Sequence, residues 1–272
     1  MARLGVAASA SLGADVLERL AASHDVAFCL TRPDSPRGRG RKLAPTPAKS
    51  VAERLGIPVL QPDRLEEGLE LPADTVVVAA YGLLIPETLL RRALWLNVHP
   101  SLLPRWRGAA PVERAIMAGD AETGVTIHRT VEALDAGPIA AQEAFSIGSD
   151  DDAGAVFRRS AGVAARLLDE VLAQPEPAFV PQAGEATYAE KLTAGDRLLD
   201  WSRPPQESLN RIRALSPHVG ARGEVDGRTL VVWRARPASV GSTLVAGGLE
   251  LVEVQPEGRR RMSAEAYLRG RR

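Results

Sequence analysis

The sequence has little cysteine, little lysine and no long apolar run, and each absence excludes a class of protein. Cys29 is the only cysteine, so an intramolecular disulfide framework and a multi-cysteine metal site are excluded. The longest apolar stretch, Val76 to Ile85, falls well short of the roughly 20 residues that a membrane-spanning helix needs. The N-terminus has no charged region followed by an apolar core of the signal-peptide type. We therefore expect a cytoplasmic protein without a membrane segment.

The charges are unevenly distributed along the chain, although basic and acidic residues both number 34. Residues 1–204 carry a net charge of −5, and residues 205–272 carry +5. A basic C-terminal part on an acidic body favours a polyanionic partner such as a nucleic acid. The alternative is that a small surface domain simply carries a few excess charges.

Short apolar strands alternate with helical segments in the first part of the chain, and this order predicts a parallel sheet covered by helices. No G-x-G-x-x-G follows the first strand, so the dinucleotide-binding fingerprint is absent. We expect a Rossmann-like, mostly parallel sheet domain over residues 1–187 and a linker over residues 188–204. Short strands separated by glycine-containing turns predict a small OB-like β-barrel domain over residues 205–272. The expected strands are 3–8, 25–30, 58–60, 75–80, 95–99, 125–130, 139–146, 221–225, 229–235, 244–246 and 249–255, and the expected helices are 14–22, 47–55, 64–69, 111–118, 152–174, 206–215 and 263–269.

A basic stretch between Thr31 and Pro47 has no apolar period and is rich in proline and glycine, which is typical of a long loop. Loops of this length in compact domains are often functional. Its side chains could bind phosphate groups, or they could simply be solvated. Its cationic residues are Arg32, Arg37, Arg39, Arg41 and Lys42.

Asn97 and His99 form the centre of the predicted site. Because they are two positions apart on an expected strand, they share one face and lie roughly 7 Å apart along it. An asparagine amide can stabilise a developing oxyanion, and a histidine can transfer protons near neutral pH. Glu113, Asp120 or Asp135 could complete the arrangement with a carboxylate. Asp135 lies in a tight turn that it could simply cap, so the residues alone leave the third group open.

Two stretches carry a resemblance to a known family. Residues 97–108 read NVHPSLLPRWRG and residues 134–137 read LDAG, which together resemble the signature of the 10-formyltetrahydrofolate-dependent formyltransferases. The resemblance implies transfer of a formyl group from N10 of the folate to an amine, with no metal and no covalent enzyme intermediate. It also implies that Asn97 and His99 stabilise a tetrahedral oxyanion, while Asp135 orients His99 and assists proton transfer. This agrees with the chemistry expected from the residues themselves.

Further stretches narrow the expected substrate. The basic loop and residues 107–111, 118–126, 188–192 and 200–201 are similar to the members of this superfamily that formylate methionyl-tRNA. The resemblance implies that the basic loop contacts the acceptor stem of initiator methionyl-tRNA and that the C-terminal domain follows the tRNA backbone. The folate would lie beside two loops, partly in contact with main chain. The residues implied for the folate are Ala80, Tyr81, Gly82, Leu83, Ser101, Leu102, Leu103 and Pro104, and those proposed for the tRNA are Arg37, Arg39, Arg41, Lys42, Arg211 and Arg213.

Other functions use some of the same features. A formyltransferase acting on a sugar nucleotide or another small amine would share the chemistry, but it needs neither the basic loop nor the basic C-terminal domain. A non-enzymatic folate- or RNA-binding protein would be expected to lose at least one of the three central residues, and all are present. Arg105 and Arg107 could bind a substrate phosphate or hold their own loop, and His128 is expected to be structural. We also expect a monomer.

Overall fold

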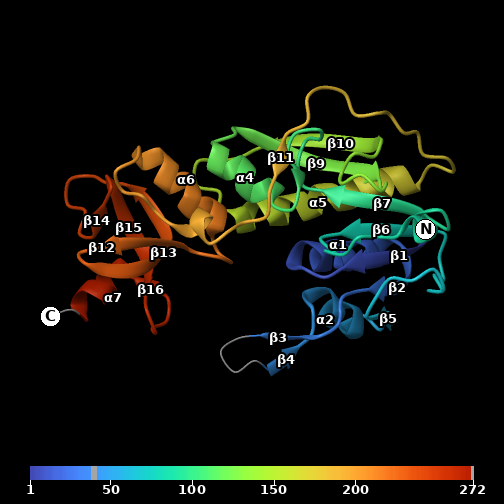
Figure 1. Cartoon of the computed structure of the whole chain (residues 1–272), viewed down its shortest axis with the longest axis horizontal. Helices are drawn as coiled ribbons and strands as arrows, with labels where there is room; N and C mark the ends of the chain where they lie inside the picture. The colour runs from blue at the N-terminus through green and yellow to red at the C-terminus, as the bar shows by residue number, and fades with distance from the viewer. Residues whose placement is uncertain (38–41, 271–272) are drawn as a thin grey trace. The chain divides into compact units, whose positions relative to one another are not determined.

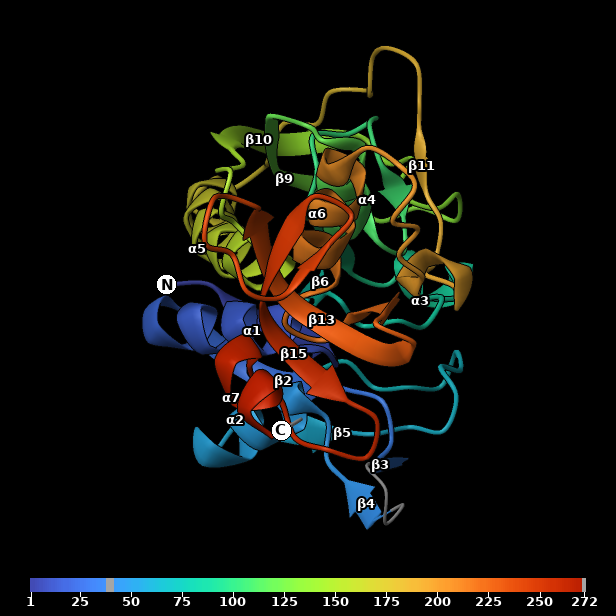
Figure 2. The same ribbon diagram turned by 90° about the vertical axis from the view of Figure 1, so that its left-hand side faces the viewer.

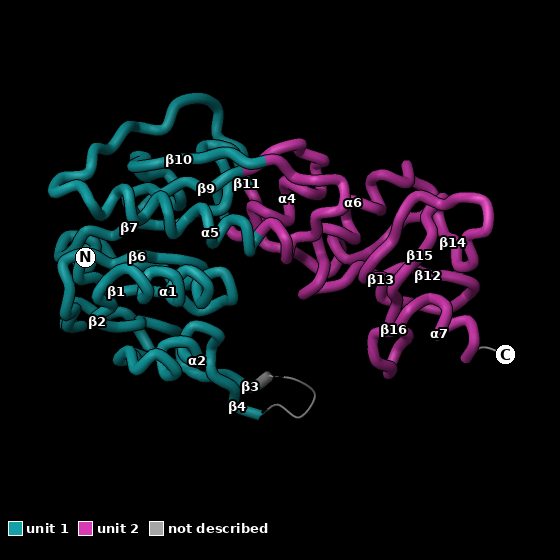
Figure 3. The backbone as a smooth tube through the Cα atoms, turned by 180° about the vertical axis from the view of Figure 1, so that it is seen from behind, with its two compact units in different colours: residues 1–108, 124–145, 157–188 teal, residues 109–123, 146–156, 189–272 magenta. Residues whose placement is uncertain are grey.

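The computed structural model describes residues 1–37 and 42–270. The chain forms two compact units, each built from segments that are separated in the sequence (Figure 3). Unit 1 comprises residues 1–108, 124–145 and 157–188. Unit 2 comprises residues 109–123, 146–156 and 189–272. The domain limits that we place at residues 187 and 205 stay a prediction.

A seven-stranded sheet organises the first part of the chain (Figure 1). Its strands are β1 (Arg3–Ala8), β2 (Asp25–Leu30), β5 (Val59–Leu60), β6 (Thr75–Ala79), β7 (Leu94–His99), β9 (Glu122–Arg129) and β10 (Ile139–Ser146). They lie in the order β10-β9-β7-β6-β1-β2-β5. The pairs β1–β2, β1–β6, β2–β5 and β6–β7 are parallel, and β7–β9 is antiparallel. The expected Rossmann-like, mostly parallel sheet is therefore confirmed.

Both faces of this sheet are buried, which explains the near-continuous apolar run in β6. Val77 belongs to one apolar cluster, whereas Val76 and Val78 belong to another. Alternate side chains of a strand point to opposite faces, so a strand covered on both sides has apolar residues at every position. The helices that accompany the sheet are α1 (Ser11–Ser23), α2 (Pro47–Arg54), α3 (Glu87–Leu90) and α5 (Ala153–Leu172).

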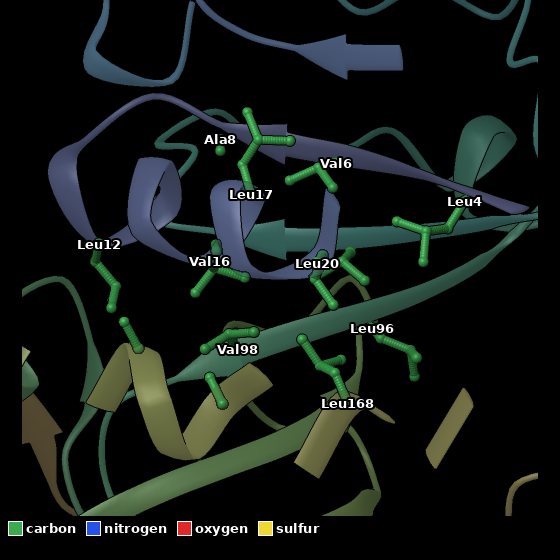
Figure 4. Packing of buried hydrophobic residues seen from close by; sticks show 14 of the residues in the cluster. Leu4, Val6, Ala8, Leu12, Val16, Leu17, Leu20, Leu96, Val98 and Leu168 are labelled. Carbon is green, nitrogen blue, oxygen red and sulfur yellow. The ribbon is translucent and has the colours of Figure 1, made fainter. Parts of the chain in front are cut away.

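The apolar residues of helix α1 repeat at helical spacing and form one buried face. Val16, Leu17 and Leu20 recur at helical spacing and are fully buried. They share a cluster with Val6 of β1 and Val98 of β7 (Figure 4). This core lies beneath β7, the strand that carries Asn97 and His99. Within the described residues, no helix is both long enough and apolar enough to cross a membrane.

The basic segment contains a short antiparallel hairpin, β3 (Ser35–Arg37) and β4 (Lys42–Ala44). The prediction of a loop without regular structure is wrong at these strands, because three-residue strands are too short to show an apolar alternation. Buried hydroxyls tie the two ends of the segment together. Thr31 Oγ1 lies 3.4 Å from Ser9 Oγ and 2.7 Å from Thr46 Oγ1. The base of the hairpin is thus attached to the end of β1.

Unit 2 contains a curled antiparallel sheet (Figure 2). The elements of unit 2 are α4 (Pro111–Ala118), η1 (Gly195–Arg197), α6 (Pro205–Leu215), β12 (Ala221–Val225), β13 (Arg228–Pro237), β14 (Val245–Ala246), β15 (Leu249–Pro256), β16 (Met262–Ser263) and α7 (Ala264–Arg269). Strand β8 (Arg107–Gly108) belongs to unit 1, and β11 (Tyr188–Ala189) lies at the boundary between the units in the sequence. The strand order is β12-β13-β15-β14, with β16 paired to β15, and the β13–β15 register shifts around Arg234. Such shifts increase the local twist. Ile212 and Leu215 of α6 share one apolar cluster with Val232 and Leu251 of the sheet. The small barrel-like C-terminal domain is confirmed.

Candidate active site

The structure brings the three predicted central residues together at the end of β7. Asn97 and His99 share one face of the strand, and Asp135 comes from the turn between β9 and β10. Asn97 Nδ2 donates a hydrogen bond of 3.1 Å to Asp135 Oδ1. His99 Nδ1 lies 3.6 Å from Asp135 Oδ2. An amide, an imidazole and a carboxylate therefore form one cluster, in which His99 is 4% exposed and Asp135 is 9% exposed.

The backbone around this cluster is held in unusual conformations. Asp135 has a φ of 48° and Trp106 a φ of 63°, in the left-handed region that non-glycine residues rarely adopt. Each is fixed by a hydrogen bond within the cluster: the Gly108 N–H donates to Asp135 Oδ2 at 2.8 Å, and Trp106 O lies 2.8 Å from His99 Nε2. Backbone strain of this kind persists where surrounding contacts enforce it and is frequent at active sites. The other two candidate carboxylates, Glu113 and Asp120, belong to unit 2.

Burial and charge set the protonation states of the pair. Burial lowers the pKa of His99 below its ordinary value, and the Asp135 carboxylate only partly offsets this. Burial alone would raise the pKa of Asp135, but hydrogen bonds and neighbouring charges outweigh it and the pKa lies below the usual value. Because Trp106 O can only accept, His99 carries its proton on Nε2. The Nδ1 lone pair of a neutral His99 therefore faces an ionised carboxylate, a suitable arrangement for accepting a proton.

The His99 imidazole is expected to titrate below pH 6.5, the ordinary pKa of histidine, because burial lowers its pKa. Protonation at Nδ1 would remove the base. The measurement is the pH titration of the His99 ring ¹⁵N resonances in the free enzyme, because a rate profile also contains the substrate α-amine, which must be neutral to attack and titrates at about pH 8. Replacing Asp135 with asparagine should move the His99 midpoint further down, since the Asp135 charge raises the His99 pKa. A His99 midpoint above pH 6.5 would contradict this assignment.

Sequence reasoning missed two residues that complete the cluster. His128 Nε2 lies 3.0 Å from Asn97 Nδ2, and Gln182 Nε2 donates to Asp135 O at 2.7 Å. Gln182 also accepts from Arg107 at 2.6 Å, so Arg107 holds its own loop in this structure. Arg105 is exposed, with its guanidinium 4.5 Å from the Trp106 ring centroid. The only feature of the sequence that bears on His128 is the alternation of side chains along the strand expected over residues 125–130.

The residues proposed for the folate differ in how accessible they are. Ala80, Gly82 and Leu83 are exposed, and Ala80 has a left-handed φ of 47°. The Tyr81 side chain is buried, and burial raises its pKa to about 12. Ser101 is fully buried, and its hydroxyl donates to a backbone carbonyl of its own loop. Main-chain contact thus fits these two residues better than side-chain contact. Leu103 is buried, Leu102 and Pro104 are half-buried, and all eight folate assignments stay predictions.

The residues proposed for the tRNA are only partly described. Arg37 and Lys42 are the paired end residues of the β3–β4 hairpin, and Lys42 is exposed. Arg39 and Arg41 lie outside the described residues. In unit 2, Arg211 donates to the Leu198 carbonyl at 2.6 Å, and Arg213 donates to backbone carbonyls of residues 148 and 151. These bonds give both C-terminal arginines a structural role, and their contact with tRNA stays a prediction. Within residues 1–37 and 42–270, no group of three His, Cys, Asp or Glu could hold a metal ion.

A mostly parallel sheet with an amide, an imidazole and a carboxylate at the end of one strand is the arrangement expected of a formyltransferase. Residues 5–172 match the family described as formyl transferase, and residues 191–272 match the formyl transferase C-terminal domain. The chain is also 39% identical over 277 residues to the methionyl-tRNA formyltransferase of Methylococcus capsulatus, with 92% of this chain and 90% of that protein covered. The chain belongs to the formyl transferase family and, within it, to the methionyl-tRNA formyltransferases.

Two solved structures share the fold. The methionyl-tRNA formyltransferase from Clostridium thermocellum has a TM-score of 0.62 at 14% identity, covering 93% of this chain and 99% of that chain. HypX from Aquifex aeolicus in complex with tetrahydrofolic acid has a TM-score of 0.68 at 16% identity, covering 98% of this chain and 47% of that chain. At these identities the likeness concerns the fold alone.

Proposed function

We propose that this chain transfers the formyl group of 10-formyltetrahydrofolate to the α-amine of methionine on initiator methionyl-tRNA. The observation that carries the proposal is the buried contact of Asp135 with Asn97, at 3.1 Å, and with His99, at 3.6 Å. The names of the relatives and the basic hairpin support methionyl-tRNA as the formyl acceptor. The folate enters as a co-substrate, and no metal takes part in the proposed steps.

The reaction begins when the methionine amine attacks the formyl carbon. A carbon–nitrogen bond forms, and the carbonyl electrons move to the oxygen to give a tetrahedral oxyanion. The amine proton passes to His99 Nδ1, directly or through a water, and Asp135 stabilises the resulting imidazolium. Collapse of the intermediate breaks the bond to N10 of the folate, which takes the proton, and tetrahydrofolate leaves. His99 is thus a base in the first step and an acid in the second.

Asn97 and the protonated His99 stabilise the oxyanion between these two steps. Both hydrogens of the Asn97 amide are already engaged, one with Asp135 Oδ1 and the other with His128 Nε2. The oxyanion therefore receives an Asn97 hydrogen by sharing with, or replacing, one of these acceptors. A donor that is oriented before the substrate arrives needs little reorganisation during the reaction, which is the main source of electrostatic catalysis.

The experiment that tests the proposal measures formyl transfer from 10-formyltetrahydrofolate to initiator and to elongator methionyl-tRNA. We expect rapid formylation of the initiator and slow formylation of the elongator. A sugar-linked amine serves as the third acceptor, because the alternative function uses the same chemistry on a small substrate. Faster formylation of the small amine than of initiator methionyl-tRNA would overturn the proposed substrate and leave the reaction class intact.

Replacing Arg37, Arg39, Arg41 and Lys42 with alanine should weaken the use of methionyl-tRNA. Each lost phosphate contact lowers the slope of log KM against log salt by roughly 0.7–0.9, so removal of the four charges should flatten it by up to about 3.6. The matched control is the replacement of Arg3, Arg19, Arg54 and Arg91, exposed cations elsewhere in unit 1, which should leave the slope unchanged. A loss of folate binding with normal tRNA use would show that the hairpin has another role.

A further inference from the structure

His128 is a buried histidine that we expected to be structural, and it takes part in no proton transfer of the proposed steps. It lies on β9 directly opposite Asn97 of β7, in the antiparallel register that pairs these two strands. Its exposed fraction is 1%. Side chains that face each other across two strands are the closest non-local neighbours in a sheet. The pairing therefore places a second imidazole against the predicted oxyanion donor.

The hydrogen-bond partners assign the proton on this ring. His128 Nδ1 lies 3.0 Å from the Arg129 carbonyl oxygen, which can only accept, so Nδ1 carries a hydrogen. In a neutral ring Nε2 then has a lone pair and accepts from Asn97 Nδ2 at 3.0 Å. Asp135 Oδ1 lies 3.6 Å from the same Nε2, beyond hydrogen-bond range. His128 thus acts here as an acceptor for Asn97.

The orientation of the Asn97 amide is set by two hydrogen-bond acceptors that lie beside its NH₂ group. The Asn97 NH₂ group faces both His128 Nε2 and Asp135 Oδ1. Rotating the amide by 180° would place its oxygen against a carboxylate oxygen and a nitrogen lone pair, leaving both acceptors without a donor. A buried acceptor that loses its donor is costly, because it has already lost its hydrogen bonds to water. The rotated amide is therefore strongly disfavoured while His128 and Asp135 keep these states.

We infer that His128, protonated on Nδ1 and accepting on Nε2, is a positioning residue that holds the Asn97 amide with its hydrogens directed into the site. The inference rests on the proposed role of Asn97 as an oxyanion donor. Asp135 supplies the first acceptor and the charge beside His99, whereas His128 supplies only the second acceptor. Loss of His128 should therefore affect the chemical step through Asn97 and leave substrate binding nearly unchanged.

Two substitutions of His128 separate the effect of its acceptor, Nε2, from the effect of the rest of the side chain. In glutamine, Oε1 is as many bonds from Cβ as Nε2 is in histidine, so His128→Gln keeps an acceptor within reach of Asn97. In asparagine, the amide ends at the position of Nδ1, so His128→Asn keeps a donor for the Arg129 carbonyl but loses the acceptor. We expect His128→Asn to lower kcat about tenfold, the size of one hydrogen bond, with KM values within about twofold. His128→Gln should retain most of kcat.

The same substitution in an Asn97→Ala background tests whether the effect runs through Asn97. There His128→Asn should change kcat by less than about twofold, because the group that it positions is gone. Equal losses in His128→Asn and His128→Gln, or an undiminished loss in the Asn97→Ala background, would overturn the inference. If Asn97→Ala itself left kcat unchanged, the proposed mechanism would fail instead.

A measurement on the unaltered protein covers the case in which a His128 variant does not fold. The ring ¹⁵N resonances of His128 distinguish a proton on Nδ1 from one on Nε2. We expect the proton on Nδ1 at neutral pH. A proton on Nε2 would make that nitrogen a donor, which cannot accept from Asn97, and would refute the inference without any activity assay.

Discussion

Asp135→Asn is expected to lower kcat for formyl transfer by roughly 10²-fold or more, similar to the loss expected for Asn97→Ala or His99→Ala. The carboxylate accepts at both oxygens, from the Gly108 N–H at 2.8 Å and from Asn97 Nδ2 at 3.1 Å. An asparagine side chain accepts at one end only, so one of these donors would face another donor. The substitution also removes the negative charge beside His99 Nδ1, which stabilises the protonated ring.

Asp169→Asn is the matched control for this prediction. Asp169 also pairs with a histidine, since its Oδ1 lies 2.7 Å from His24 Nε2, but its side chain is 48% exposed and lies on α5. Formyl-transfer kinetics and thermal unfolding of both variants should be measured together. We expect Asp169→Asn to keep normal turnover and Asp135→Asn to lose it while remaining folded. More than about a third of normal turnover in Asp135→Asn would refute its proposed role.

The pairing of Asn97 with His99 could be predicted because it depends on the period of a single strand. A side chain two positions along a strand lies on the same face whatever the strand pairs with. The turn position of Asp135 could also be predicted from local residues. Its selection over Glu113 and Asp120 required the resemblance and the contact to Asn97 in the structure, because the tertiary path of the chain decides which acid approaches a given strand.

The position of His128 could not be predicted, because it depends on pairing between distant strands. β9 lies next to β7 and runs antiparallel to it, and the register sets His128 opposite Asn97. A register one residue away would turn the ring to the other face of the sheet. The alternation of β9 indicates a strand but contains no information about its partner.

The sequence also predicted a helix in a segment where the burial of apolar side chains does not require one. The helix expected over residues 64–69 does not form, and this segment is irregular, with a bend at residue 64 and a turn at residues 67–68. Leu65 and Leu69 still pack against an apolar cluster of the sheet, so burial is achieved without helical hydrogen bonds. The spacing of two leucines therefore predicted their burial but not the backbone between them. Net charge likewise contains no information about the bonds of the Arg213 guanidinium to backbone carbonyls, and the contact of Arg213 with tRNA stays a prediction.

Gly137→Ala is expected to destabilise the protein by about 3 kcal/mol and to lower turnover as well. A Cβ at this position would lie 1.7 Å from the Arg129 carbonyl oxygen and 3.2 Å from His128 Nδ1. The nearest atom, the Arg129 carbonyl oxygen, is backbone, so it cannot move aside as a flexible side chain would. Displacing the Arg129 carbonyl would also disturb the hydrogen bond of 3.0 Å that it accepts from His128 Nδ1. Chemical denaturation measures the first effect, and steady-state kinetics measures the second.

Gly162→Ala is the control, since it makes the same change in a site that has room for it. Gly162 lies within α5, and a Cβ there would meet nothing within 4 Å. Alanine loses less backbone entropy than glycine on entering a helix, so the control should stabilise the protein by about 0.5–1 kcal/mol. The two substitutions should thus shift the free energy of unfolding in opposite directions. If Gly137→Ala were as stable as the unaltered protein, the close approach of the Asp135 turn to β9 would be wrong, and with it the geometry that directs His128 toward Asn97.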